Sequence, residues 1–265
     1  MNRIEQKFIN LKKRNKKAFI AYITAGYPSL AVTGALVKEF DRVGVDIVEL
    51  GVPFSDPMAD GPVIQEASKA ALDKKVSLKN IINLVKNIRK DSTIPICLMT
   101  YYNPVFCYGR EKFVKDAVSS GVDGVIIPDL PPEEAGVLIR QARIKKLDTV
   151  FLVAPTSTPE RIKMISSVSQ GFIYYVSLTG VTGERVSLPL DLEKQINMIK
   201  KFTRKPVCVG FGVSNSRQVK EAGKISDGVI VGSAIVKKIK ENIKHPALVK
   251  RVGCFVSSLK DCENV

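Results

Sequence analysis

The 265-residue chain has very few of the side chains that most often bind metals or activate nucleophiles. It contains one histidine, His245, which falls in a basic segment outside the predicted strands. A histidine-ligated metal centre or a histidine-dependent triad is therefore not expected, and His245 is predicted to lie on the surface. Walker A and dinucleotide-binding fingerprints are also missing. Acid–base chemistry would have to come from carboxylates, with tyrosines as helpers.

Cysteine is scarce, and its spacing excludes two kinds of site. None of the cysteines forms a Cys-x-x-Cys pair, and their number is odd, which argues against a disulfide framework and against a zinc site. Two of them lie in predicted strands among apolar neighbours, so we expect small core residues of a reducing compartment. The five are Cys97, Cys107, Cys208, Cys254 and Cys262.

Long apolar runs are missing too. The longest are short, such as V-I-I-P after Gly124, whereas a membrane span needs roughly 20 residues. The N-terminal sequence M-N-R-I-E-Q-K-F has no apolar stretch that leads to a small-residue cleavage site, so export is not expected. We expect a cytoplasmic protein, or one of the plastid stroma if it is plastid-encoded, without membrane contact.

Positive charge is abundant, with a formal net charge of +15 and a pI near 9.6. The lysines are nevertheless spread over predicted helix faces. The one dense cluster, K-K-R-N-K-K at 12–17, is short and lacks interleaved aromatic residues. The charge therefore does not indicate nucleic-acid binding, but it favours the approach of an anionic substrate or partner.

Short strand-like runs alternate with longer amphipathic segments along the whole chain. Helical spacing of apolar residues is clear at 30–43 and 78–89. Continuously apolar strands that alternate with helices indicate a parallel sheet covered on both faces. The eight predicted strands are residues 19–24, 46–50, 95–100, 123–128, 149–153, 172–177, 206–210 and 227–231.

Eight such units predict an α/β fold, a (β/α)₈ TIM barrel, and no linker divides it, so we expect one domain over residues 1–265. An extra helix is predicted before the first strand, at 2–14, and a helical extension at 246–261. A doubly wound open sheet is the alternative fold.

The most informative stretch is V-E-L-G-V-P-F-S-D-P-M-A-D-G-P, residues 48–62. It places one carboxylate, Glu49, in an otherwise apolar strand, where an unpaired charge is costly to bury. The proline-rich loop that follows carries Asp56 and Asp60. A rigidly held acid, with a second acid on a loop that can close over a substrate, suits proton transfer.

The alternative is that Glu49 is a paired or partly solvated acid and that Asp56 and Asp60 are ordinary turn residues. The barrel favours catalysis, because its chemistry lies at the C-terminal ends of strands, where Glu49 falls. Polar residues and glycines collect at the same ends, among them Tyr22, Thr24, Tyr102 and Tyr174.

Glycine loops after the last strands predict a phosphate site. G-F-G-V-S at 210–214 and V-G-S-A-I-V at 231–236 follow the last two strands, and L-T-G-V-T-G-E-R at 178–185 follows the sixth. Backbone N–H groups at a helix N-terminus bind anions, and barrels commonly bind phosphate after strands 7 and 8. The alternative is that these loops are only helix caps.

Seven ordered blocks resemble one family, the α subunit of tryptophan synthase, over nearly the whole chain. The most specific is the stretch at 48–62. The others are A-Y-I-T-A-G-Y-P at 21–28, M-T-Y-Y-N-P-V-F at 99–106, P-D-L-P-P-E-E at 128–134, G-V-T-G at 180–183, and the G-F-G-V-S and V-G-S-A-I-V loops.

The resemblance implies a retro-aldol cleavage of indole-3-glycerol phosphate to indole and glyceraldehyde 3-phosphate, without metal or organic cofactor. Glu49 matches the general acid–base that protonates indole C3 and deprotonates the glycerol hydroxyl. Asp60 matches the acid that stabilises charge at the indole N–H. This division suits the reaction, because the departing indole needs a proton at C3 and a hydrogen-bond acceptor at nitrogen.

The resemblance also implies the substrate contacts. Tyr174 matches a tyrosine near the glycerol, and Thr182 belongs to a loop that closes over the site. Tyr22 stands where relatives often have Phe at the indole pocket, and Thr24 and Tyr102 are expected to contact substrate. The phosphate is expected to meet Gly183, Phe211 through its backbone, Gly212, Gly232 and Ser233.

The family works as an αββα complex, so a β subunit that carries pyridoxal phosphate is the expected partner. The loop at 53–60 and Asn103–Pro104 would face it. Closure of the 178–190 loop would respond to the partner's state. Many relatives have other residues at Leu178 and Thr179, so the contacts of this loop are left open.

Two other functions compete with this lyase. One is another phosphate-binding barrel, such as a sugar-phosphate isomerase or epimerase, but metal-dependent epimerases need histidines that the chain lacks. The other is a non-catalytic subunit that only activates a β partner. The presence of Glu49 and Asp60 argues against it, because docking needs neither acid.

Overall fold

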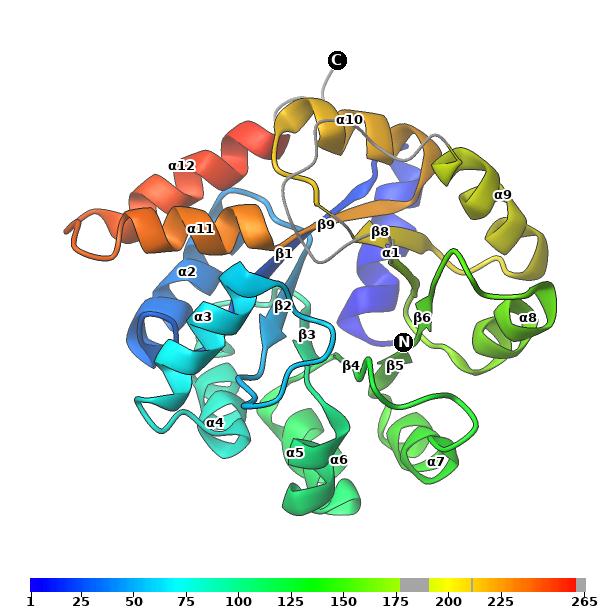
Figure 1. Cartoon of the computed structure of the whole chain (residues 1–265), viewed down its shortest axis with the longest axis horizontal. Coiled ribbons are helices and arrows are strands. Elements are labelled where there is room, and N and C mark those ends of the chain that lie inside the picture. Colours follow the sequence, from blue (N-terminus) through cyan, green and yellow to red (C-terminus); the bar gives the residue numbers. More distant parts are fainter. Residues whose placement is uncertain (177–190, 211, 261–265) are drawn as a thin grey trace.

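The strands close on themselves into a barrel (Figure 1). The computed structural model describes residues 1–176, 191–210 and 212–260. In these ranges one sheet runs in the order β5-β4-β3-β2-β1-β9-β8-β7-β6, and every neighbouring pair is parallel. Its strands are β1 (Ala18–Thr24), β2 (Ile47–Gly51), β3 (Ile96–Met99), β4 (Gly124–Ile126), β5 (Asp148–Val150), β6 (Leu152–Val153), β7 (Ile173–Val176), β8 (Val207–Gly210) and β9 (Gly228–Val231).

The two end strands of this order, β5 and β6, are consecutive in the chain and separated only by Phe151. The sheet therefore returns to its starting point, which confirms the predicted barrel and excludes the open doubly wound sheet. The predicted strand at 149–153 is divided in two, and the other seven predicted strands each match one observed strand.

Helices surround the strands (Figure 1). Most of them present an apolar stripe inward; α4, for example, buries Ile81, Val85 and Ile88 and begins at the N-cap Ser77. The helices in the described ranges are α1 (Arg3–Lys13), α2 (Leu30–Arg42), α3 (Pro62–Leu72), α4 (Leu78–Ile88), α5 (Tyr102–Tyr108), α6 (Arg110–Ser120), α7 (Gly136–Lys145), α8 (Pro159–Val168), α9 (Leu192–Phe202), α10 (Ser216–Ile225), α11 (Ser233–Glu241) and α12 (Leu248–Lys260). The predicted helices at 30–43, 78–89, 2–14 and 246–261 are confirmed to within two residues.

The inside of the barrel is closed at one end by α1. Ile4, Phe8 and Leu11 lie on one face of this helix and pack into the interior cluster of strand side chains. The ring of Phe8 meets that of Phe172 with centroids 5.8 Å apart. The helix thus fills the N-terminal end of the barrel, and the C-terminal ends of the strands are left for function.

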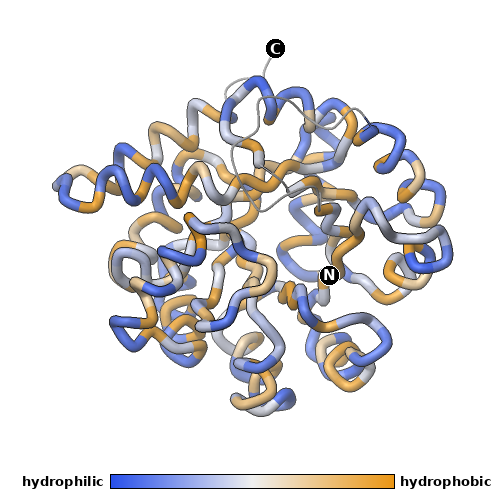
Figure 2. Tube along the Cα trace, viewed as in Figure 1, coloured by the Kyte–Doolittle hydropathy of each residue, from blue (hydrophilic) through white to orange (hydrophobic). Residues whose placement is uncertain are grey.

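Hydropathy follows this plan, with apolar residues on the strands and the inner helix faces (Figure 2). The prediction of core cysteines is confirmed for Cys97 and Cys208, which are buried, and is wrong for Cys107 and Cys254, which are exposed. Both exposed cysteines lie on helices, where one face is always solvated, and Cys262 lies outside the described residues. In the described ranges no helix has the length and apolarity to cross a bilayer.

Candidate active site

Glu49 points into the barrel from the middle of β2. Side chains alternate along a strand, so Glu49 shares the inward face with Ile47, which belongs to the interior cluster. Its side chain is 0% exposed, and neither carboxylate oxygen has a hydrogen-bond partner among the residues that the structure describes. Burial, with a smaller contribution from the charge of Asp60, raises the pKa of Glu49 to about 8. Glu49 therefore holds a proton at neutral pH that it can give away.

Asp60 ends the loop that leads from β2 into α3. It precedes Gly61, the N-cap, and Pro62, the first helical residue, so a stiff helix start fixes its backbone. One of its oxygens, Oδ2, accepts a hydrogen bond from the Tyr101 hydroxyl at 3.2 Å. Burial raises the pKa of Asp60, and this hydrogen bond opposes the rise. Because Asp60 starts from a lower ordinary pKa and has a donor, it ionises before Glu49.

Two tyrosines lie with these acids at the rim. Tyr22 of β1 pairs in register with Glu49, and Tyr174 lies in β7; both are buried. Burial raises the pKa of each phenol, and the charges of Glu49 and Asp60 add to the rise for both. The four titratable groups thus form one electrostatically coupled cluster inside the C-terminal end of the barrel.

Glycines at the strand ends make room for these rings. A Cβ on Gly51 would lie 2.1 Å from the Tyr22 hydroxyl oxygen, and one on Gly210 would lie 2.5 Å from that of Tyr174. A Cβ on Gly232 would approach Cδ1 of Tyr22 to 3.2 Å. Gly232, predicted only as a phosphate ligand, therefore also seats an aromatic ring of the cluster.

Thr24 and Tyr102, the other predicted substrate contacts, are placed differently. Thr24 is buried two residues beyond Tyr22, on the same face of β1. Tyr102 opens α5, donates its N–H to Asp129 at 2.9 Å and faces Phe106 with ring centroids 6.0 Å apart. The described hydrogen bonds join its neighbour Tyr101, and not Tyr102, to Asp60.

Tyr101 lies at a predicted strand end beside Tyr102, but the sequence did not single it out as a site residue. The strand β3 ends at Met99, so the alternation of side chains stops before the two adjacent tyrosines and cannot tell which one faces the cluster. The signal that could have found it is the aromatic pair itself at a strand end, next to an acid-bearing loop.

The predicted phosphate site falls at two neighbouring strand ends. Gly232 is the N-cap of α11 and Ser233 is its first residue, and no described side chain caps this helix. Gly212 has a positive φ of 28° beyond the end of β8, which pairs with β9. The helix start offers free N–H groups and a favourable dipole to an anion. Thr182, Gly183, Phe211, Leu178 and Thr179 lie outside the described residues.

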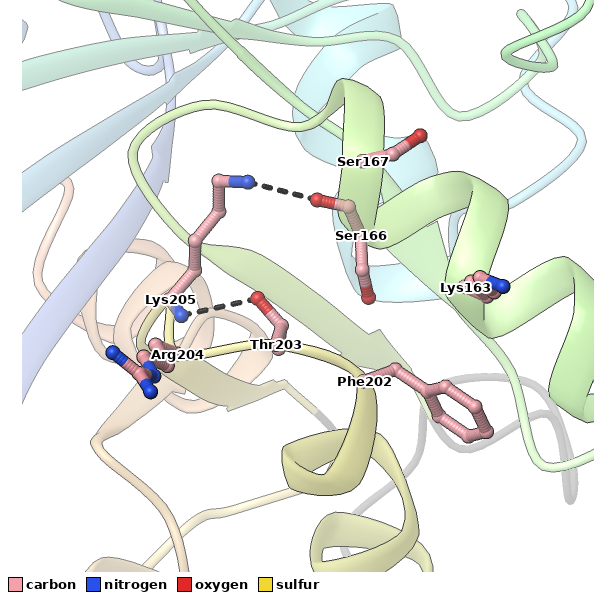
Figure 3. A pocket seen from close by; sticks show the side chains of 7 residues that line it. All are labelled: Lys163, Ser166, Ser167, Phe202, Thr203, Arg204 and Lys205. Atoms are coloured by element: carbon pink, nitrogen blue, oxygen red, sulfur yellow. Dashed lines mark hydrogen bonds between the residues drawn. The ribbon is translucent and has the colours of Figure 1, made fainter.

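Other parts of the described chain offer less chemistry. His245 is exposed, as predicted, and the described ranges hold no group of three or more His, Cys, Asp or Glu side chains placed to bind a metal. A pocket of about 530 Å³ lies between α8 and the segment that leads into β8 (Figure 3). Lys163 and Arg204 point away from each other there, and Lys205 is bonded to the carbonyl oxygen of Ser166 at 2.8 Å. No carboxylate lines this pocket, so it offers no acid–base pair.

Comparison with known proteins gives one consistent result. A family model described as tryptophan synthase alpha chain matches residues 8–264. The tryptophan synthase alpha chain of Geotalea uraniireducens (strain Rf4) is 48% identical over 260 residues, which are 98% of this chain and 97% of the relative. That of Caldanaerobacter subterraneus subsp. tengcongensis is 46% identical over 261 residues, covering 98% and 99%. The crystal structure of tryptophan synthase subunit alpha from Legionella pneumophila str. Paris superimposes with a TM-score of 0.93 at 37% identity, covering 100% of this chain and 99% of that one.

Proposed function

The chain belongs to the tryptophan synthase alpha chain family, and from that premise we propose that Glu49 and Asp60 carry out its reaction. The reaction is that of a lyase of tryptophan biosynthesis, which cleaves indole-3-glycerol phosphate into indole and glyceraldehyde 3-phosphate. The indole passes to a β subunit. The roles of individual residues, one domain over 1–265 and a cytoplasmic location are part of the proposal.

Glu49 acts first as an acid and then as a base. Its proton goes to C3 of the indole, which turns the ring into an indolenine with positive charge at nitrogen. The resulting carboxylate takes the proton of the neighbouring glycerol hydroxyl, the carbon–carbon bond breaks with its electron pair returning to the ring, and the aldehyde forms. Glu49 ends protonated, so the cycle closes without another proton donor.

Asp60 stabilises the intermediate. It is ionised when Glu49 is protonated, and it accepts a hydrogen bond from the indole N–H that strengthens as positive charge develops there. Tyr22 and Thr24 contact the indole end of the substrate. Tyr174 and Thr182 contact its glycerol part, and Tyr102 contacts the substrate from the rim of the barrel. The phosphate is held at Gly212, Gly232 and Ser233, together with Gly183 and the backbone of Phe211.

One observation carries this proposal: a fully buried carboxyl with both oxygens unpartnered among the described residues faces a second acid at the end of a barrel where chemistry occurs. A carboxyl kept only for stability would be hydrogen-bonded. The proposed reaction needs no metal or organic cofactor in this chain, and pyridoxal phosphate belongs to the β partner.

The β subunit is proposed to cover the loop at 53–60 and Asn103–Pro104 in an α₂β₂ complex. Two large apolar side chains are exposed on this side of the rim, Met58 at 82% and Phe106 at 59%. Such side chains at one edge fit a protein partner.

The test is indole release from indole-3-glycerol phosphate by the purified protein, with and without a tryptophan synthase β subunit. We expect indole from the chain alone and faster release in the complex. If the chain stimulates the β subunit but releases no indole in either case, it is the non-catalytic activating subunit and the proposal fails.

A further inference from the structure

Tyr101 links two parts of the rim that are far apart in the sequence. It is the N-cap residue of α5, its side chain is 5% exposed, and its ring stacks on that of Phe54 with centroids 5.1 Å apart and planes 28° apart. Its hydroxyl accepts a hydrogen bond from the Ala59 N–H at 2.9 Å and donates one to Asp60 Oδ2 at 3.2 Å. One phenol thus holds two consecutive residues of the loop that bears Asp60.

The other side-chain hydrogen bonds of this loop within the described residues are local. The hydroxyl of Ser55 bonds the carboxylate of Asp56, its direct neighbour. The side chain of Gln65, from the helix that follows, reaches the carbonyl oxygen of Asp60 at 2.8 Å. These bonds shape the loop but do not anchor it to a strand. Tyr101 lies two residues beyond the end of β3, so its hydrogen bonds anchor the loop to the neighbouring strand.

We propose that Tyr101 is a positioning residue for the reaction, which fixes Asp60 at the substrate and favours its ionised form by hydrogen bonding to Oδ2. The inference rests on the proposed function of Asp60. A hydroxyl that donates to a carboxylate stabilises the charged form, and the bond from Ala59 directs the hydroxyl proton toward Asp60 by occupying the oxygen as an acceptor.

The charged and titratable groups around Asp60 determine how its pKa would respond to loss of the hydrogen bond from Tyr101. Glu49 of β2, Tyr22 of β1 and Tyr174 of β7 respond to its charge, and Asp129, which follows β4, acts on Tyr101. No cation is among these groups in the described part of the chain. Tyr101 is therefore the donor that opposes the rise in the pKa of Asp60 caused by burial.

The reaction needs protonated Glu49 and ionised Asp60, so kcat/KM rises through the pKa of Asp60 and falls through that of Glu49. Removing the hydroxyl raises the pKa of Asp60 and moves the acidic limb to higher pH. The alkaline limb should stay in place, because the Tyr101 hydroxyl bonds to Asp60 and not to Glu49. A residue that only supports the fold would move neither limb.

The experiment compares Tyr101→Phe with the wild type in the complex with a β subunit, by indole release from pH 5.5 to 9. We expect kcat to fall about 10-fold with little change in KM, and the acidic limb to move up by about 0.5–1 pH unit. Tyr108→Phe is the matched control, because Tyr108 lies at the other end of α5 and its hydroxyl also donates to an aspartate, Asp116 of α6, at 2.7 Å, outside the cluster. It should leave rate and profile unchanged.

An unmoved acidic limb in Tyr101→Phe, whatever its kcat, overturns the inference. Asp60→Asn is measured in parallel. If Asp60→Asn keeps its turnover, the proposed function of Asp60 fails. If Asp60→Asn is inactive and the acidic limb of Tyr101→Phe has not moved, only the role of Tyr101 is rejected. Should Tyr101→Phe not fold, Phe54→Leu removes the stacked ring alone. It should shift the limb in the same direction by a smaller amount.

Discussion

The two ends of the barrel treat a buried acid in opposite ways. At the N-terminal end Asp123 is 3% exposed, and its oxygens accept hydrogen bonds from Arg3 at 2.8 Å, Arg89 at 2.9 Å and the N–H of Ile96 at 2.9 Å. At the C-terminal end Glu49 is 0% exposed, and nothing in the described ranges hydrogen-bonds either oxygen. Both carboxyl groups are buried, but Asp123 has hydrogen-bond donors and Glu49 has none among the described residues.

The difference separates stability from chemistry. A buried carboxylate with two guanidinium partners and a backbone donor ties α1, α4 and β3 together. A buried carboxyl without partners keeps its proton instead, which makes it a poor structural element and a good acid. The fold accepts this cost at the end of the barrel where a substrate can use the proton.

The largest effect is expected from Glu49→Gln. Glutamine has nearly the same shape but can neither give nor take the proton, so turnover should fall by on the order of 10³-fold while substrate binding is kept. Single-turnover indole release and calorimetric titration with substrate measure the two quantities. Near-normal turnover would show that Glu49 is not the acid–base.

The stability of Glu49→Gln shows whether its loss of turnover comes from unfolding. The folded pKa of Glu49, about 8, lies above the ordinary value of 4.5, so the wild type loses stability as pH rises between these values. Glu49→Gln lacks this loss and should be at least as stable as the wild type at pH 8 in urea unfolding. Lower stability at pH 8 would mean that Glu49 has a structural partner.

The next effect is expected from Asp123→Asn. The substitution leaves the half-buried Arg89 without the carboxylate it pairs with, and we expect the free energy of unfolding to fall by about 3 kcal/mol. Turnover per folded molecule should not change, because Asp123 lies at the other end of the barrel. Urea unfolding and active-site-normalised indole release measure both.

Asp91→Asn is the matched control. Asp91 also pairs with a cation, Lys38, but both side chains are exposed, and exposed pairs contribute little. Its effect on unfolding should be small. If Asp123→Asn were equally mild, the hydrogen bonds around Asp123 would not be what stabilises this end of the barrel.

Local pattern was enough to predict part of this comparison. Strand alternation and the apolar neighbours of Glu49 are enough to predict that this acid lies inside the barrel. The same reasoning correctly buries Cys97 and Cys208. It fails for Cys107 and Cys254, because a helical residue can face either way and the sequence signal there is weak.

Contacts across long sequence distances could not be predicted. The partners of Asp123 come from positions 3 and 89, and the partner of Asp60 is Tyr101. Which of Tyr101 and Tyr102 faces the cluster depends on where β3 ends. The break at Phe151 likewise depends on the path of the barrel wall and not on any local break in the apolar run.

Asp148→Asn tests the comparison between the two ends of the barrel through the pH dependence of stability. Asp148 starts β5 at the N-terminal end, yet its Oδ2 is buried without a partner in the described chain, like the oxygens of Glu49. Burial raises the pKa of Asp148 to about 7; a hydrogen bond with the Asn2 side chain opposes the rise, and the charges of Glu5 and Asp123 add to it. Because the folded value exceeds the ordinary 3.8, this group should lower stability as pH rises from about 4 to about 7.

Asp148→Asn removes that titration. Relative to the wild type, its free energy of unfolding in urea should rise as the pH goes from about 4 to about 7, with no change in turnover. Asp148 would then show that a buried acid with one unpartnered oxygen is not sufficient for catalysis: it also needs the C-terminal end and a second acid. An unchanged pH dependence would mean that Asp148 is ionised in the folded protein, and the contrast between the two ends would be complete.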